Sequence, residues 1–233
     1  MVSLSQRCRQ PEIMDQPDLD PRQHAAALRG LARLNFFGSA GVLWPALTAL
    51  AQAGGGRPMR ILDLATGGGD VPLRLWRRAR KAGIKLQLEG CDISPFAVEQ
   101  ATAAATKTAS DVHFFVHDAV RGGPIPGYDA VISSLFLHHL SEDDVCMFLR
   151  NMAACAPLLL INDLERGPLN YAAVFTASRL LTRSPVVHVD ALRSVAAAFT
   201  LNEARRLAAD AGLHGATVSR RWPCRFLLTW RRT

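Results

Sequence analysis

Short apolar runs recur along the chain from residue 60 onward, and they alternate with segments long enough for a helix. Runs of this length, bounded by glycine, proline and polar residues, are typical of buried β-strands. They predict seven strands, at residues 60–64, 85–91, 112–116, 128–133, 158–162, 216–221 and 225–230.

The connections between these runs predict how the strands pair. Segments that we expect to be helical separate the first five strands, and such alternation predicts right-handed crossovers and a parallel sheet with helices on both faces. Only Trp222, Pro223 and Cys224 separate the last two strands. Because so short a link cannot contain a helix, the last strand should run antiparallel to its neighbour. The pattern therefore predicts an α/β fold with a seven-stranded, mostly parallel sheet and an antiparallel last strand.

Apolar residues at helical spacing precede the sheet pattern, over residues 21–53. An uncharged stretch, 36–56, approaches the length of a membrane span. Gly38, Pro45 and a run of three glycines interrupt it, so we expect a helix that ends at the glycines instead. Residues 1–56 are then expected to form a helical cover in front of the main domain.

The main domain, 57–233, contains one connection that is much longer than the others. The segment between the fifth strand and Thr200 exceeds the usual length of a link in an α/β unit. Insertions at this end of a sheet commonly cover the ligand crevice, so residues 164–199 are expected to form a helical lid. Ser141 and Thr200 each precede an acidic residue by three positions, which predicts that both begin helices as N-caps.

The clearest chemical motif lies where the first predicted strand ends. The apolar strand contains an acidic residue, Asp63, and runs into a turn with three consecutive glycines at 67–69 that opens a helix. Glycine lets the backbone approach a ligand closely and adopt positive φ, and the free N–H groups of the helix start favour a polar or anionic ligand. Such a turn fits either a nucleotide or S-adenosylmethionine.

Two nucleotide motifs fit this turn poorly. Read from Gly67 and Gly69, the dinucleotide fingerprint needs a small residue where the chain has Pro72. No Gly-Lys-Ser/Thr follows the turn, which excludes a phosphate-binding P-loop.

The turn resembles the first motif of the class I, Rossmann-like S-adenosylmethionine-dependent methyltransferases, acidic-x-Gly-x-Gly-x-Gly. Asp63, Ala65, Gly67 and Gly69 occupy its positions, with alanine in place of the first glycine. The resemblance covers the strand pattern from residue 60 to residue 165. It implies that the chain is an enzyme that uses S-adenosylmethionine and releases S-adenosylhomocysteine.

The resemblance also implies which residues hold the cofactor. In the family, an acid after the second strand binds the ribose hydroxyls and an acid after the third serves the adenine edge; Asp92 and Asp118 match these positions. A carboxylate can accept two hydrogen bonds from a vicinal diol. Arg33, in the N-terminal helix, would reach the cofactor's carboxylate. The expected cofactor-binding residues are Asp63, Ala65, Thr66, Gly67, Gly69, Asp92, Ile93, Asp118, Ala119, Ser133, Ser134 and Arg33.

Histidines supply the candidate catalytic groups. Methyl transfer is an in-line displacement that mainly needs positioning and, for a phenolic or enolic acceptor, a base that removes a proton near neutral pH. The loop after the fourth strand carries His138 and His139, and the expected lid carries His188. We rank His139 first, His138 second and His188 third, each with the alternative of a structural hydrogen bond. Cysteines and histidines lack metal-ligand spacing, so no metal site is expected.

The fifth strand ends in Glu165 and Arg166. These two residues either orient an acceptor or take part in structural ion pairs.

Charge and cysteine usage narrow the partners and the compartment. The net charge is +7, but the basic residues at 74–85 and 220–232 alternate with apolar ones, as solvated faces do. No Asn/Asp-Pro-Pro-Tyr/Phe sequence, typical of many methyltransferases that act on nucleic-acid bases, follows the fourth strand. We therefore expect no nucleic-acid partner. Scattered cysteines and an N-terminus unlike a signal peptide favour a cytoplasmic protein.

A looser resemblance concerns the acceptor. Residues 11–15, the Leu-His-His-Leu sequence at 137–140 and the Asn-Asp-Leu sequence at 162–164 are similar to bacterial methyltransferases found with polyketide and phenolic-lipid biosynthesis. This resemblance implies a phenolic hydroxyl as the acceptor. The expected lid carries many apolar side chains and few charges, which favours a hydrophobic acceptor. We therefore expect O-methylation of a small, largely apolar aromatic or polyketide-derived acceptor, by a monomer or homodimer. C-methylation of a quinone-type precursor, a non-catalytic protein that binds S-adenosylmethionine and, more distantly, a nicotinamide oxidoreductase remain alternatives.

Overall fold

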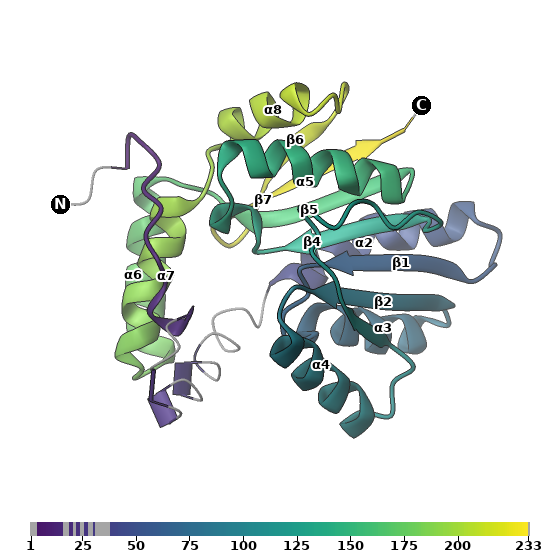
Figure 1. Cartoon of the computed structure of the whole chain (residues 1–233), viewed down its shortest axis with the longest axis horizontal. Helices are drawn as coiled ribbons and strands as arrows, with labels where there is room; N and C mark the ends of the chain where they lie inside the picture. The colour runs from purple at the N-terminus through teal and green to yellow at the C-terminus, as the bar shows by residue number, and fades with distance from the viewer. Residues whose placement is uncertain are drawn as a thin grey trace.

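A seven-stranded sheet forms the centre of the molecule (Figure 1). The structure, a computed structural model, describes residues 4–15, 19–20, 22–23, 26–27, 30 and 38–232. The strand order is β3-β2-β1-β4-β5-β7-β6, and β7 alone runs antiparallel to its neighbours. The predicted sheet with its antiparallel last strand is therefore confirmed. The strands are β1 Met59–Leu64, β2 Leu86–Asp92, β3 His113–Val116, β4 Ala130–Ser134, β5 Leu158–Leu164, β6 Thr217–Arg221 and β7 Arg225–Arg231.

Helices cover both faces of the sheet and divide the core into two layers. Side chains alternate along a strand, so Ile61 of β1 packs in one layer and Leu62 in the other. Burial on both faces explains why the central strands read as nearly continuous apolar runs. The Ile61 layer contains α2 (Ser39–Ala53), α3 (Asp70–Ala82) and α4 (Pro95–Lys107), and the Leu62 layer contains α5 (Glu142–Cys155) and α8 (Leu201–Asp210).

One predicted connection is wrong. No helix lies between β3 and β4, although we expected helices between all of the first five strands. Glycine and proline are the poorest helix formers, and they make up much of this link. They are Gly122, Gly123, Pro124, Pro126 and Gly127.

The predicted helix starts are confirmed. The Thr200 side chain accepts a hydrogen bond from the Glu203 N–H at 3.3 Å, and the Glu203 carboxylate accepts from the Thr200 N–H at 2.8 Å, which completes a capping box. Ser141 accepts from the Asp144 N–H at 3.1 Å. The N-terminal apolar helix ends at Gly54, as its glycine run predicted.

Two helices, α6 (Pro168–Leu181) and α7 (Pro185–Ala197), follow β5 and form a separate layer beside the end of the sheet (Figure 1). The N-terminal segment, residues 4–15, runs along α7. The N–H groups of Ile13 and Met14 donate to the Asp190 carboxylate at 2.8 and 2.9 Å. The Arg193 guanidinium donates to the Pro11 carbonyl oxygen at 2.8 Å. This segment is therefore tied to the insertion rather than to the sheet.

Glu165 and Arg166 take part in structural ion pairs. Arg166, only 4 % exposed, donates to both Glu203 carboxylate oxygens at 2.9 and 2.6 Å. Glu165 accepts from the Arg220 guanidinium at 2.9 Å. The two residues thus bind β5 to α8 and to β6, and they do not pair with each other.

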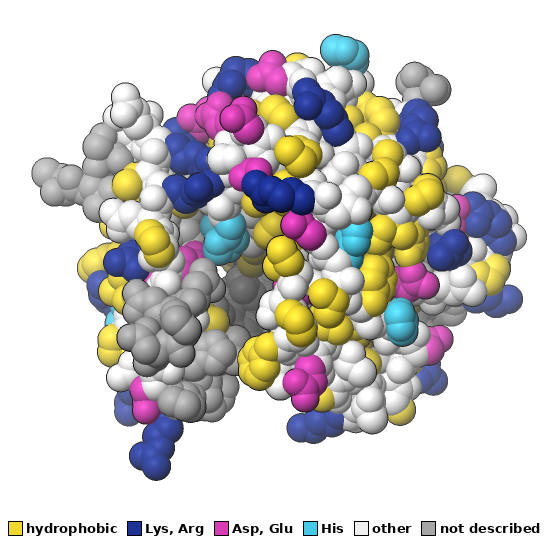
Figure 2. All heavy atoms as spheres, in the orientation of Figure 1, with side chains coloured by type: hydrophobic (Ala, Val, Ile, Leu, Met, Phe, Trp, Pro, Cys, Tyr) yellow, Lys and Arg dark blue, Asp and Glu magenta, His cyan; other side chains and the backbone are white. Residues whose placement is uncertain are grey.

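Basic side chains do not gather into one patch on the face shown in Figure 2, where they lie among acidic and apolar ones. No helix in the described ranges has the length and hydrophobicity needed to cross a bilayer.

We expect Asp190→Ala to lower the free energy of unfolding by about 3 kcal/mol, because each hydrogen bond to a charged group is worth about 1.5–3 kcal/mol and two N–H groups lose their acceptor. Amide exchange should rise in residues 4–15 before it rises in the sheet. Asp210→Ala is the control, since Asp210 is half exposed in an ion pair with Arg206 and such pairs contribute about 0–1 kcal/mol. Equal losses in the free energy of unfolding of the two variants, measured by urea denaturation, would contradict the role of Asp190 in holding the N-terminal segment.

Candidate active site

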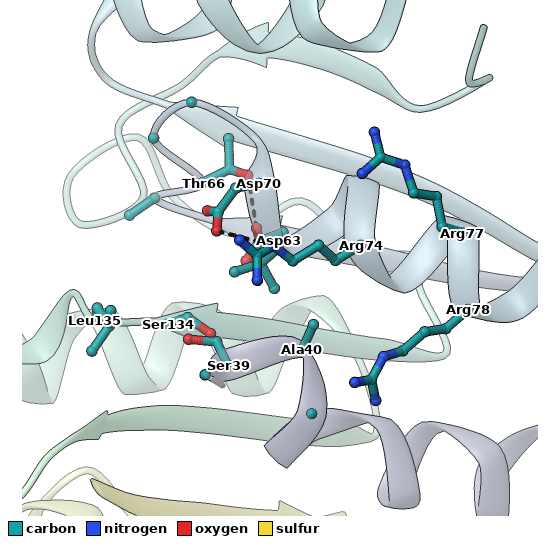
Figure 3. A pocket seen from close by; sticks show the side chains of 16 residues that line it. Ser39, Ala40, Asp63, Thr66, Asp70, Arg74, Arg77, Arg78, Ser134 and Leu135 are labelled. Carbon is teal, nitrogen blue, oxygen red and sulfur yellow. Dashed lines mark hydrogen bonds and ion pairs between the residues drawn. The ribbon is translucent and has the colours of Figure 1, made fainter. Parts of the chain in front are cut away.

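A cavity of about 760 Å³ lies between the glycine turn, the start of α2 and one side of α3 (Figure 3). Parallel strands end at the same edge of a sheet, so β1 and β4 both contribute residues to it. Its lining comprises Gly38, Ser39, Ala40, Gly41, Asp63, Ala65, Thr66, Gly67, Gly68, Asp70, Val71, Arg74, Arg77, Arg78, Ser134 and Leu135.

Asp63 is a buried carboxylate beside this cavity, with 1 % of its surface exposed. Thr66 Oγ1 donates to Asp63 Oδ2 at 2.7 Å. Asp63 Oδ1 has no hydrogen-bond partner among the described residues, nor has Ser134 Oγ. Burial without a cation raises the pKa of Asp63 to about 8. Two buried, unsatisfied polar atoms at one cavity are what a polar ligand would pair with.

The backbone of the turn is bent at positive φ, at Ala65 (56°), Gly67 (54°) and Gly69 (75°). Ala65 holds a conformation that glycine adopts without strain, at the position where the resembling motif has glycine. A Cβ on Gly69 would lie 2.6 Å from the Phe114 ring and 2.9 Å from the Ala101 Cβ. A Cβ on Gly67 would meet no atom within 4 Å. Gly69 is therefore needed for packing as well as for its φ, and Gly67 only for its φ.

The acidic residues after β2 and β3 both support local turns. Asp92 accepts from the Gly67 N–H at 2.8 Å with one oxygen and from the Ser94 N–H at 3.0 Å with the other. Asp118 accepts from the N–H groups of Val120 and Arg121 at 2.8 and 2.9 Å. The hydrogen bond from the Arg121 N–H is the main cause that lowers the pKa of Asp118. Neither aspartate lines the 760 Å³ cavity, but Asp92 fixes the glycine turn that does.

A second cavity, of about 620 Å³, lies beyond the loop after β4, between the N-terminal segment, α6, α7 and the β6–β7 turn. Leu135, at a positive φ of 57°, lines both cavities. Most of the lining side chains are apolar. They are Leu135, Leu164, Leu169, Ala173, Val174, Ala177, Ala191, Trp222 and Pro223, with Glu12, His138, His139, Asn170, Ser194, Cys224 and Arg225.

His138 and His139 lie on the short 3-10 helix η2 (Leu137–His139) at the wall of this second cavity. His138 is buried, and its Nδ1 is 2.7 Å from Asp163 Oδ1 at the end of β5. Burial by itself lowers the pKa of His138, but the Asp163 carboxylate outweighs it and raises the pKa above its usual value. His139 reaches the surface, although the chain around its ring and the neighbouring His138 lower its pKa to about 4.

His188 lies on α7, where its Nε2 is 2.9 Å from the Thr182 carbonyl oxygen. It lines neither of the two cavities. The structure therefore brings two of the three candidate histidines together and leaves the third in a local hydrogen bond.

Comparison with known proteins shows which part of the chain is similar to a known family. Residues 61–156 match the family described as a methyltransferase domain. The match spans less than half of the chain. The chain has the class I, Rossmann-like fold of the S-adenosylmethionine-dependent enzymes. No curated protein sequence matches the chain.

Solved structures share this fold at low sequence identity. Magnesium protoporphyrin IX methyltransferase from Synechocystis PCC 6803, with S-adenosylhomocysteine bound, is 16 % identical, with 94 % of this chain and 91 % of that one covered and a TM-score of 0.56. An S-adenosylmethionine-dependent methyltransferase from Aquifex aeolicus is 19 % identical, with 91 % and 98 % covered and a TM-score of 0.56. The plantazolicin methyltransferase BamL, in complex with a triazolic desmethylPZN analog and S-adenosylhomocysteine, is 17 % identical, with 85 % and 67 % covered and a TM-score of 0.56.

The predicted cofactor residues divide into two groups. Asp63, Ala65, Thr66, Gly67 and Ser134 line the first cavity. The others do not. Gly69 packs behind the turn, Ser133 Oγ donates to the Leu64 carbonyl oxygen at 2.9 Å, Ala119 is in the core, Ile93 is 64 % exposed next to Asp92, and Arg33 lies outside the described residues.

Several lining residues were not predicted. Arg74, Arg77 and Arg78 of α3 line the first cavity (Figure 3); the sequence favoured a solvated face for them, although their three- and four-residue spacing places them on one side of a helix. Gly38 and Gly41 also line this cavity, although from the sequence we interpreted glycines in this stretch only as helix breakers. The second cavity was not predicted, because no local sequence pattern indicates that the β6–β7 turn lies beside α6.

We expect the two glycine variants to differ in stability. Gly69→Ala should lower the free energy of unfolding by about 3 kcal/mol or more, since overpacking and positive-φ strain add. Gly67→Ala adds only the strain, about 1–2 kcal/mol. Urea denaturation of both variants measures the difference, and equal losses would contradict the separate roles.

Asp63→Asn should become more stable relative to the wild type as the pH rises from 5 to 8. The folded protein holds a proton on Asp63 up to about pH 8, whereas the unfolded chain releases it near pH 4. Ionisation of the buried carboxyl therefore costs wild-type stability over this window, and asparagine, which keeps the acceptor for Thr66, does not ionise. Urea denaturation at pH 5, 6.5 and 8 gives the difference; a constant difference would show that Asp63 titrates normally.

Proposed function

We propose that the methyltransferase transfers the methyl group of S-adenosylmethionine to a hydroxyl of a small, largely apolar aromatic or polyketide-derived acceptor. The observation that carries the proposal is that two cavities share the lining residue Leu135. Leu135 lines both the glycine-turn cavity, with its unsatisfied polar atoms, and the apolar cavity, and His138 lines the apolar one. Methyl transfer needs this arrangement, because donor and acceptor must be held in line.

The first cavity offers groups for the amino-acid part of the cofactor. Asp63 Oδ1 is free to accept from an ammonium group, and Ser134 Oγ is available beside it. Arg74 pairs with Asp70 at 3.8 Å, and Arg77 and Arg78 add positive charge to this side of the cavity, which favours a carboxylate. Asp92 uses one lone pair of each oxygen on a backbone N–H, and a carboxylate has further lone pairs for a ribose diol. When bound, the cofactor supplies the electrophilic methyl group.

The second cavity sets the class of acceptor. Its walls from α6 and from the β6–β7 turn are mainly aliphatic and aromatic, so an apolar ring or chain would bury its surface there. Helices α6 and α7 line this cavity, so they would act as a lid that excludes water from the bound acceptor. A dry site strengthens every charge interaction inside it.

His138 is the base that the geometry favours, ahead of His139. Asp163 accepts a hydrogen bond from the Nδ1–H group of His138 and so favours the tautomer whose Nε2 can take a proton. An aspartate behind a histidine is a recurring way to orient a general base. Asp163 is a positioning residue in this proposal, and His139 contacts the acceptor from the neighbouring wall.

Binding and product analysis test the proposal. Calorimetry with S-adenosylhomocysteine should show one site, and S-adenosylmethionine with a panel of alkylated phenols should give an O-methylated product by mass spectrometry and NMR. A C-methylated ring would point to the quinone-type alternative, which needs the same cofactor site and base. Tight binding with no turnover across the panel would favour a non-catalytic protein.

His138→Asn should lower kcat by about 10²-fold or more, the contribution of a general base, while S-adenosylhomocysteine affinity stays unchanged. His188→Asn is the matched control, since His188 lines neither cavity, and its kcat should be that of the wild type. Unchanged turnover in His138→Asn would overturn the assignment of the base.

A further inference from the structure

Three metal-ligating side chains from distant parts of the chain meet at the wall of the apolar cavity. One ligand-type atom from each of Glu12, His138 and His139 lies within 4.8 Å of the other two. The histidines are neighbours on η2, whereas Glu12 belongs to the N-terminal segment that α7 holds in place. Two imidazoles and a carboxylate are a common ligand set for divalent transition-metal ions.

His138 is already held as metal-bound histidines usually are. Its Nδ1 is 2.7 Å from Asp163 Oδ1, and both side chains are at most 5 % exposed. Metal-ligating histidines almost always donate their other ring N–H to a carboxylate or carbonyl, which fixes the tautomer and raises the basicity of the ligating nitrogen. Asp163 therefore leaves Nε2 of His138 free for an ion.

The cluster is also open to ligands. The same three side chains line a smaller pocket of about 360 Å³, together with Arg9, Arg193 and their neighbours. An ion there would have protein ligands on one side and open positions towards the cavities. Sites with three protein ligands and an open position can bind a further small molecule.

We propose that Glu12, His138 and His139 form a site for a divalent transition-metal ion of the Zn²⁺ or Co²⁺ type, with Asp163 as the partner that orients His138. Ligand atoms about 2.0–2.2 Å from a tetrahedral ion are roughly 3.3–3.6 Å apart. The observed spread of up to 4.8 Å closes by small rotations. Glu12 and His139 can make them because neither is buried.

Glu12 supplies the negative charge that the site needs. Arg9 and Arg193 line the pocket and repel a cation, whereas the Glu12 carboxylate attracts it. Glu12 accepts a hydrogen bond from Ser194 Oγ of α7, which orients it. Glu12→Gln keeps the size of the side chain and removes its charge, so it is the sharpest single change.

Cobalt binding to the full chain tests the site directly. Metal-stripped protein titrated with Co²⁺ should develop visible d–d absorption that saturates at one equivalent and disappears when Zn²⁺ is added. Glu12→Gln and His139→Asn should each weaken Co²⁺ binding by about tenfold or more, the size of effect seen even for outer-sphere partners. The matched controls, Glu99→Gln and His214→Asn, change exposed residues away from the cluster and should bind as the wild type does.

Circular dichroism of each variant establishes that it is folded. No saturable d–d absorption in the wild type, or wild-type affinity in folded Glu12→Gln, would overturn the proposal. The metal site and the proposed function use the same nitrogen of His138, because the base would take the acceptor's proton there. The test of the metal site therefore measures binding and not turnover. Failure of cobalt binding leaves methyl transfer standing, and failure of methyl transfer leaves the metal site standing.

Discussion

The parallel alignment of the central strands is the constraint on which the site depends. Because β1, β2, β4 and β5 all run the same way, their carboxyl ends meet at one edge of the sheet. Polar residues that are far apart in sequence therefore gather there, Asp63 from β1 and Asp163 from β5 among them. The helices on both faces keep the strands themselves apolar, so the strand ends are where polar groups can be concentrated.

The two buried aspartates at this edge show how their surroundings decide their charge. Both are at most 1 % exposed. Asp163 faces His138, which lowers its pKa against the effect of burial, so it stays ionised. Asp63 has only a hydroxyl from Thr66, and burial raises its pKa. Asp163 is thus already paired with His138 within the fold. Asp63 has no such partner, so it can pair with a cationic group of a ligand in the first cavity.

The insertion and the N-terminal segment build the second cavity together. Asp190 of α7 accepts the N–H groups of Ile13 and Met14, and Arg7 donates to the His138 carbonyl oxygen at 2.8 Å. The Arg7 guanidinium also lies over the Phe199 ring, 3.9 Å from its centroid. These contacts hold Glu12 beside the histidine pair, so the same packing that stabilises the insertion also completes the polar wall of the apolar cavity.

The sequence by itself determined the sheet, its antiparallel last strand, the helix caps and the glycine turn, because these follow from local periodicity, link length and backbone freedom. It did not predict the irregular β3–β4 link, where the glycines and prolines were the available signal. Tertiary structure alone decided which side chains meet: Asp163 with His138, Glu12 with the histidine pair, and the α3 arginines with the first cavity. Such contacts join residues up to more than a hundred positions apart, and their formation depends on how whole elements pack, which no local pattern encodes.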